Sequence, residues 1–108
     1  MKRILLLERD YRLTETLLRD TGFVVNTATS AELALPLIRT NKYDALVIDP
    51  QDQNGHIPEL LREANQQGLR AILATSLPRE QIHYQEQFEY FRKPLNTKPN
   101  FFKLLSGD

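Results

Sequence analysis

Runs of consecutive apolar residues recur along the chain, at residues 4–7, 45–48 and 71–74. No polar residue interrupts them, which is typical of strands covered on both faces of a parallel sheet. Two further segments have strand-like length and are rich in β-branched or aromatic residues. The pattern therefore predicts five strands, at residues 2–7, 23–28, 45–48, 71–75 and 89–92.

Apolar residues at helical spacing lie between the strands. They predict full helices at residues 10–20, 30–40 and 57–67, and only short helices at 78–87 and 101–105. Asp10 and Ser30 are the expected N-caps of the first two helices, because their side-chain oxygens can accept from free backbone amides. Pro36 lies inside the second helix, where it removes a hydrogen bond, so we expect a distortion there.

Strands and helices alternate along the whole chain, which predicts an α/β fold with a parallel sheet and helices on both faces. Polar residues follow the strands: Glu8, Arg9 and Asp10 after the first, Asp49 after the third, Thr75 at the end of the fourth and Lys93 after the fifth. In open α/β sheets the chemistry lies at these carboxyl ends. We therefore expect a functional site there.

Length and composition narrow the function classes. The 108 residues fit one domain, residues 1–108. Fourteen Lys and Arg balance 14 Asp and Glu, and there is no basic run, so direct nucleic-acid binding is not expected. No apolar stretch is long enough to span a membrane. Cysteine is absent, which excludes disulfides and thiolate zinc sites and is compatible with the cytoplasm, the expected location.

The order of these residues resembles the receiver (CheY-like) domain of bacterial two-component response regulators. Residues 2–8 are similar to the first strand and its acidic end, and residues 43–49 are similar to the strand that carries the phospho-accepting aspartate. Thr75 matches the switch hydroxyl, Tyr90 the switch aromatic residue, and Lys93 with Pro94 the lysine-proline pair. The resemblance covers the full chain and implies a flavodoxin-like (βα)5 sandwich with strand order 2-1-3-4-5, here with shortened fourth and fifth helices.

The resemblance also implies a chemistry. In this family the aspartate, here Asp49, takes a phosphoryl group from a histidine kinase, and a magnesium ion held by acidic residues assists. The lysine, here Lys93, pairs with the phosphoryl group, and we expect it to pair with Asp49 in any case. Thr75 and Tyr90 occupy the positions that move together and change the surface read by a partner.

Two departures from the family pattern affect this site. Arg9 stands where the family usually has its second acid, a change of two charge units, each worth about 4 kcal/mol at about 4 Å and an effective dielectric near 20. We expect the Arg9 guanidinium to pair with Asp49 and to take the place of the metal. The loop after Asp49 is also two residues shorter than usual, with Pro50 immediately and Gly55 six residues on.

The leading hypothesis is a degenerate receiver, or pseudo-receiver: a signalling interaction module, not an enzyme, that needs neither a cofactor nor magnesium-dependent phosphorylation of Asp49. Its expected partners are proteins such as a histidine kinase, an output domain, another signalling protein or a second copy in a homodimer. The alternative is a working phospho-acceptor in which Glu8, Asp10 and Asp49 hold Mg²⁺. A flavodoxin-like module for a small anionic ligand, or a small-molecule enzyme, ranks third because no glycine-rich phosphate loop is present.

Overall fold

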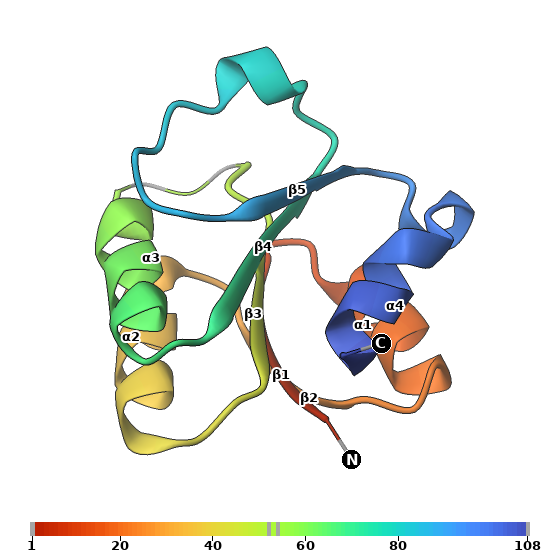
Figure 1. Cartoon of the computed structure of the whole chain (residues 1–108), viewed down its shortest axis with the longest axis horizontal. Helices are drawn as coiled ribbons and strands as arrows, with labels where there is room; N and C mark the ends of the chain where they lie inside the picture. The colour runs from red at the N-terminus through yellow and green to blue at the C-terminus, as the bar shows by residue number, and fades with distance from the viewer. Residues whose placement is uncertain (1, 52, 54, 108) are drawn as a thin grey trace.

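The computed structural model of the chain describes residues 2–51, 53 and 55–107. Five parallel strands form one sheet in the order β2-β1-β3-β4-β5, as expected for a flavodoxin-like fold (Figure 1). The strands are β1 Arg3–Leu7, β2 Val24–Ala28, β3 Ala45–Ile48, β4 Arg70–Thr75 and β5 Glu89–Arg92. All five predicted strands are thus confirmed, and β2 and β5 are the two edges of the sheet.

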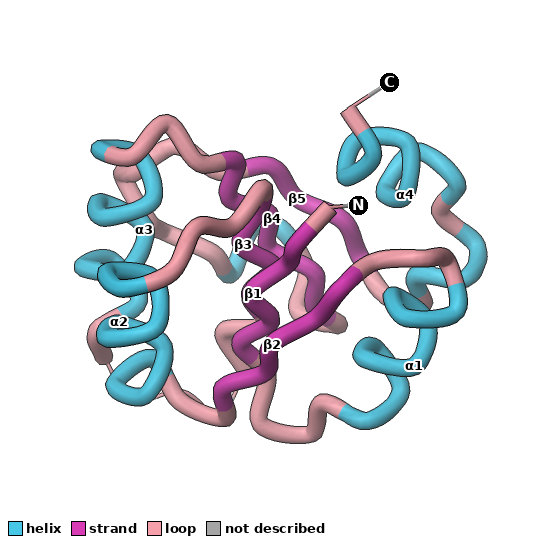
Figure 2. The backbone as a smooth tube through the Cα atoms, turned by 90° about the horizontal axis from the view of Figure 1, so that it is seen from below, coloured by secondary structure: helices cyan, strands magenta, loops and turns pink. Residues whose placement is uncertain are grey.

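Helices cover both faces of the sheet. They are α1 Arg12–Asp20, α2 Ala31–Thr40, α3 Ile57–Gln66 and α4 Pro99–Ser106. The helices α2 and α3 pack on one face, and α1 and α4 pack on the other (Figures 1 and 2). The predicted three-layer arrangement is therefore present. No helix within the described ranges has the length and apolar character needed to cross a membrane.

The central strand β1 supplies side chains to both layers of the core. Leu5 and Leu7 pack with α2 and α3, whereas Ile4 and Leu6 pack with α1 and α4, and all four are fully buried. Successive side chains of a strand point to opposite faces, so a strand buried on both faces has no polar position. This is why the run at residues 4–7 is uninterrupted.

The helix starts confirm one of the two predicted caps. Ser30 caps α2, since its Oγ accepts from the Leu33 amide at 3.2 Å. The predicted Asp10 cap is wrong: α1 begins at Arg12, Tyr11 is its N-cap residue, and no side chain bonds the first turn. The helix α2 runs through Pro36 to Thr40 without interruption, and Pro36 lies on its exposed side.

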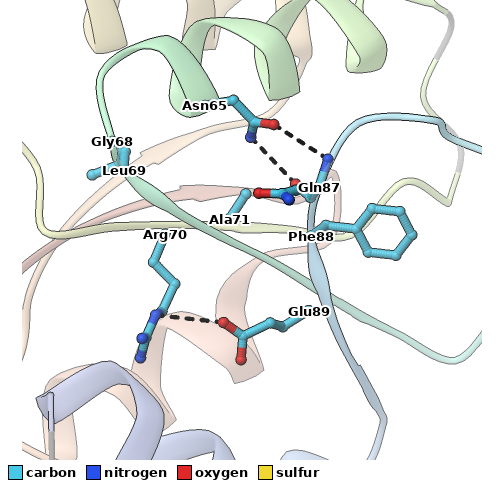
Figure 3. A pocket seen from close by; sticks show the side chains of 8 residues that line it. All are labelled: Asn65, Gly68, Leu69, Arg70, Ala71, Gln87, Phe88 and Glu89. Atoms are coloured by element: carbon cyan, nitrogen blue, oxygen red, sulfur yellow. Dashed lines mark hydrogen bonds and ion pairs between the residues drawn. The ribbon is translucent and has the colours of Figure 1, made fainter.

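The segment between β4 and β5 contains no α-helix among its described residues, only the 3₁₀ turn η1, Arg79–Gln81. The predicted shortening of the fourth helix is confirmed. Ile82 takes part in the core from this segment. Figure 3 shows how its far end is held: the Asn65 side chain donates to the Gln87 carbonyl at 3.3 Å and accepts from the Gln87 amide at 3.2 Å. The last helix, α4, has eight residues and follows a second 3₁₀ turn, η2, Leu95–Thr97.

Candidate functional site

The carboxyl ends of the strands bring the predicted site residues together. Because Leu7 pairs with Ile48 in the parallel register, the next residues, Glu8 and Asp49, leave β1 and β3 side by side. Lys93 approaches from the end of β5. A hollow of about 230 Å³, which we call the strand-end pocket, is lined by Glu8, Arg9, Asp10, Asp49, Gln51, Ser76 and Lys93.

Lys93 joins the two buried acids of this pocket. Its Nζ lies 2.8 Å from Asp49 Oδ2 and 2.8 Å from Glu8 Oε2. Both carboxylate side chains are only 8% exposed, and the lysine side chain is 19% exposed. Burial of this kind strengthens the attraction but makes each charge costly without its partner. Lys93 is therefore the cation that pairs with the two buried acids, and its predicted contact with Asp49 is present.

The pairing moves the pKa values of the groups involved. Burial lowers the pKa of Lys93, but the contacts with Asp49 and Glu8 outweigh this effect and raise the pKa above its ordinary value. Burial raises the pKa of Glu8, and the contact with Lys93 offsets this only in part. The second oxygen of Glu8, Oε1, is buried and has no hydrogen-bond partner among the described residues. The burial of Glu8 is thus only partly compensated by its contacts.

Asp49 is fixed at the start of its loop. Its amide donates to the Leu7 carbonyl at 2.8 Å, which extends the pairing of β3 with β1 by one residue. Its Oδ1 accepts from the Gln51 amide at 3.0 Å, and its Oδ2 accepts from Lys93. Both carboxylate oxygens therefore have partners from this chain. Gln51 was not expected as a site residue. Aspartate side chains commonly accept a hydrogen bond from the backbone amide two residues later, and this rule could have indicated Gln51.

Thr75 and Tyr90 both contact the same residue, Leu77. The Leu77 amide donates to Thr75 Oγ1 at 3.2 Å, and the Tyr90 hydroxyl donates to the Leu77 carbonyl at 2.6 Å. Thr75 is fully buried, and Tyr90 is half-buried against the core under α2 and α3. The two predicted switch positions are thus linked through one loop residue.

The predicted pairing of Arg9 with Asp49 is wrong. Arg9 is exposed and makes no ion pair within the described residues. It lines the rim of the strand-end pocket and also a neighbouring hollow of about 330 Å³ toward Ser30 and the start of α2. The chain turns at Arg9 and Asp10, directly after β1. Arg9 stays at the exposed rim, and Lys93 takes the position next to Asp49.

The acids of this pocket do not fit a divalent metal ion as they stand. Asp10 is exposed, and the described residues contain no group of three or more His, Cys, Asp or Glu side chains that could hold a metal. Magnesium requires oxygen ligands in near-octahedral geometry. Glu8 Oε2 and Asp49 Oδ2 each already bind the Lys93 ammonium. Asp10, the third acid that lines the pocket, is exposed, so the three carboxylates are not gathered around one point.

Comparisons with solved structures show which proteins share this fold. No protein-family model matches the chain, and no curated protein matches it significantly. The fold is similar to that of the response regulator TrrA from Thermotoga maritima, solved in complex with Mg²⁺-BeF. Sequence identity is 26%, each chain is covered to 96%, and the TM-score is 0.77. TrrA has also been solved in complex with the histidine kinase ThkA; that structure matches at 25% identity, 96% coverage of each chain and a TM-score of 0.71.

Two structures of lower sequence identity also share the fold. The receiver domain of NtrC4 from Aquifex aeolicus matches at 16% identity with a TM-score of 0.80, covering 99% of this chain and 95% of the other. The receiver domain of a sensor histidine kinase from Pseudomonas aeruginosa PAO1, solved with a magnesium ion in its active-site cleft, matches at 20% identity. Its TM-score is 0.74, and the match covers 99% of this chain and 98% of the other.

Proposed function

We propose that the chain is a pseudo-receiver, a degenerate member of the receiver (CheY-like) domains of two-component response regulators, whose fold it shares. It works as a signalling interaction module that recognises a protein partner, without catalysis of its own and without magnesium-dependent phosphorylation of Asp49. One observation carries the proposal: Arg9 lines the strand-end pocket at the position where the family usually has its second acid. The Lys93 ammonium, 2.8 Å from both Glu8 and Asp49, is expected with either function.

The charge of the strand-end pocket supports this function. Glu8, Asp10 and Asp49 contribute three negative charges, and Arg9 and Lys93 contribute two positive ones, which leaves a net charge of −1. An acid in place of Arg9 would make that charge −3. The attraction for a divalent cation is correspondingly weaker in this chain, even though Arg9 does not touch Asp49.

The proposed partners are a histidine kinase or an output domain, as a similar receiver, TrrA, has been solved with a histidine kinase. A second copy of the chain is a further partner, and direct binding of nucleic acid is not proposed. We place the contact surface on the side of β4 and β5, where the segment between Thr75 and Tyr90 runs without an α-helix in its described residues. A partner that fits this surface would distinguish the chain from receivers that carry a full helix there.

Phosphorylation with a small donor tests the proposal. The protein is incubated with Mg²⁺ and acetyl phosphate, and the intact mass is measured over time. We expect no stable addition on the wild-type chain and weak Mg²⁺ binding by titration calorimetry. Arg9→Asp is the informative variant: it restores the acid, so Mg²⁺ affinity should rise at least about tenfold, the effect of 1.4 kcal/mol.

The alternative is a working phospho-acceptor. The unpartnered Glu8 Oε1 favours it, because a buried carboxylate oxygen without a partner is a natural cation ligand. In that case the wild-type chain gains the mass of one phosphoryl group, Asp49→Asn abolishes the gain, and Arg9→Asp changes Mg²⁺ affinity little. This result would exclude the pseudo-receiver proposal. Arg12→Asp is the matched control, since it introduces the same charge change at an exposed position outside the strand-end pocket.

A further inference from the structure

The edge strand β2 presents free backbone groups to solvent. The Val24 amide donates to the Lys2 carbonyl, and the Glu8 amide donates to the Ala28 carbonyl, so the even-numbered residues of β2 face β1. The direction of the backbone amides and carbonyls alternates along a strand. The amide and carbonyl groups of Val25 and Thr27 therefore point away from β1, toward solvent. Of their amides and carbonyls, only the Val25 carbonyl has a contact among the described residues, from the Arg19 guanidinium at 2.9 Å.

This edge lies in an open groove. A hollow of about 790 Å³ follows β2 between α1 and α2, which flank it on opposite sides (Figure 2). Leu33 of α2 lines the groove and is 56% exposed. Leu37, one helical turn further, lines it as well and is partly buried. An uncovered edge strand beside apolar side chains is a site for strand addition.

We propose that a second copy of this chain occupies the groove, with the two β2 strands antiparallel across a two-fold axis at Asn26. In this register Val25 of each copy lies opposite Thr27 of the other. Antiparallel strands form pairs of hydrogen bonds at alternate positions. Each Val25–Thr27 pair exchanges two backbone hydrogen bonds, so the two pairs of the dimer form four. The two sheets then become one continuous ten-stranded sheet with an isologous interface.

The charges beside the strand fit this occupant. On α1, Arg19 contacts the Val25 carbonyl, and Glu15 accepts from the Thr27 hydroxyl. Within each copy these two side chains also pair with each other, Arg19 Nε lying 3.4 Å from Glu15 Oε1, so the dimer joins two such pairs into one network. The two-fold axis exchanges positions 25 and 27, so it brings Glu15 of one copy beside Arg19 of the other, twice. On the opposite face, Leu33 and Leu37 cover the same residues of the second copy. Backbone, charged and apolar groups are thus each self-complementary, which a general peptide ligand would not require.

This interface lies on the opposite edge of the sheet from the contact surface proposed at β4 and β5, and none of its residues lines the strand-end pocket, so its failure would leave the proposal on phosphorylation untouched. It is tested by sedimentation equilibrium over a concentration series. The wild-type chain should dimerise. Thr27→Pro should weaken dimerisation about tenfold or more, since each dimer loses two backbone hydrogen bonds while the bonds between β2 and β1 remain. Thr27→Val is the matched control: it keeps the amide and should keep the dimer.

A charge exchange makes the test specific for this register. Arg19→Glu and Glu15→Arg should each be monomeric alone, because like charges then meet across the axis. An equal mixture of the two variants should form a heterodimer, in which every Glu faces an Arg. A wild-type monomer at all concentrations would overturn the proposal. So would a dimer that Thr27→Pro leaves intact, or folded variants whose mixture stays monomeric; circular dichroism confirms the fold of each.

Discussion

Replacing Lys93 with methionine isolates the contribution of the ammonium shared by Glu8 and Asp49. Methionine keeps much of the length and apolar character of the lysine stem but removes the charge. The two carboxylates are each only 8% exposed and would stay buried without a cation. Removing one partner of a buried ion pair typically costs about 3–5 kcal/mol, because the remaining charge is uncompensated. We expect Lys93→Met to lower the free energy of unfolding by this amount at pH 7.

Urea denaturation followed by circular dichroism measures this loss directly. A change of 1 kcal/mol shifts Tm by about 4–8 °C in a domain of about 100 residues, so Tm should fall by about 12 °C or more. Lys42→Met is the control: it removes an exposed lysine that makes no ion pair within the described residues, and it should change the free energy of unfolding by less than about 0.5 kcal/mol.

The pH dependence separates lost charge from lost packing. In Lys93→Met, acid protonates the uncompensated carboxylates of the folded state and relieves their repulsion. The deficit relative to wild type should therefore shrink between pH 7 and pH 4. A deficit below about 1 kcal/mol at pH 7 would contradict the reasoning, and so would one that is equal at both pH values.

Three further changes test other parts of the structure. Phe101→Ala should cost about 3–5 kcal/mol in urea denaturation, because this fully buried ring packs edge-to-face on Phe91 and Phe102. Tyr90→Phe should cost about 1 kcal/mol, the typical value for one hydrogen bond, here to the Leu77 carbonyl; no change would mean that the bond is absent in solution. Glu8→Gln tests the raised pKa of Glu8. A carboxyl whose pKa is higher in the folded state binds its proton more tightly there than in the unfolded chain. Its contribution to stability is therefore greatest below the ordinary pKa of 4.5 and is lost as pH rises through the pKa of the folded state. The stability of wild type minus Glu8→Gln should thus fall above pH 4.5, and a rising difference would be contrary to the burial of Glu8.

The strands and the main helices could be predicted from local pattern, whereas the strand order followed from the family resemblance. Each central strand is buried on both faces, so the runs at 4–7, 45–48 and 71–74 carry no polar residue and are easy to find. The weak helical pattern at 78–87 also had a physical cause: Ile82 is the one buried apolar side chain among the described residues of this segment, too little for an amphipathic helix. The sequence pattern therefore predicted both the strands and the shortening of the fourth helix, which the structure reduces to the 3₁₀ turn Arg79–Gln81.

The contents of the strand-end pocket were less predictable. Strand ends placed Glu8, Asp49 and Lys93 at one edge, but two cations, Arg9 and Lys93, were available to neutralise the acids. The choice depends on side-chain direction just beyond the end of β1, where no periodic pattern remains in the sequence. The same lack of pattern hid the first turn of α1, which begins at Arg12 and leaves Asp10 outside the helix.

The loop after β4 is held by contacts that need no phosphoryl group. The Leu77 amide is held by Thr75 and its carbonyl by Tyr90, so both backbone groups of one residue are fixed by the two switch positions. Neither contact involves Asp49 or Lys93. A surface held by these bonds is therefore already formed in the free chain. A partner that binds this surface does not have to supply free energy to reorganise it. On this reasoning, Lys93 stabilises the strand-end pocket while Tyr90 maintains the surface, and substitutions at the two positions should affect stability and partner binding separately.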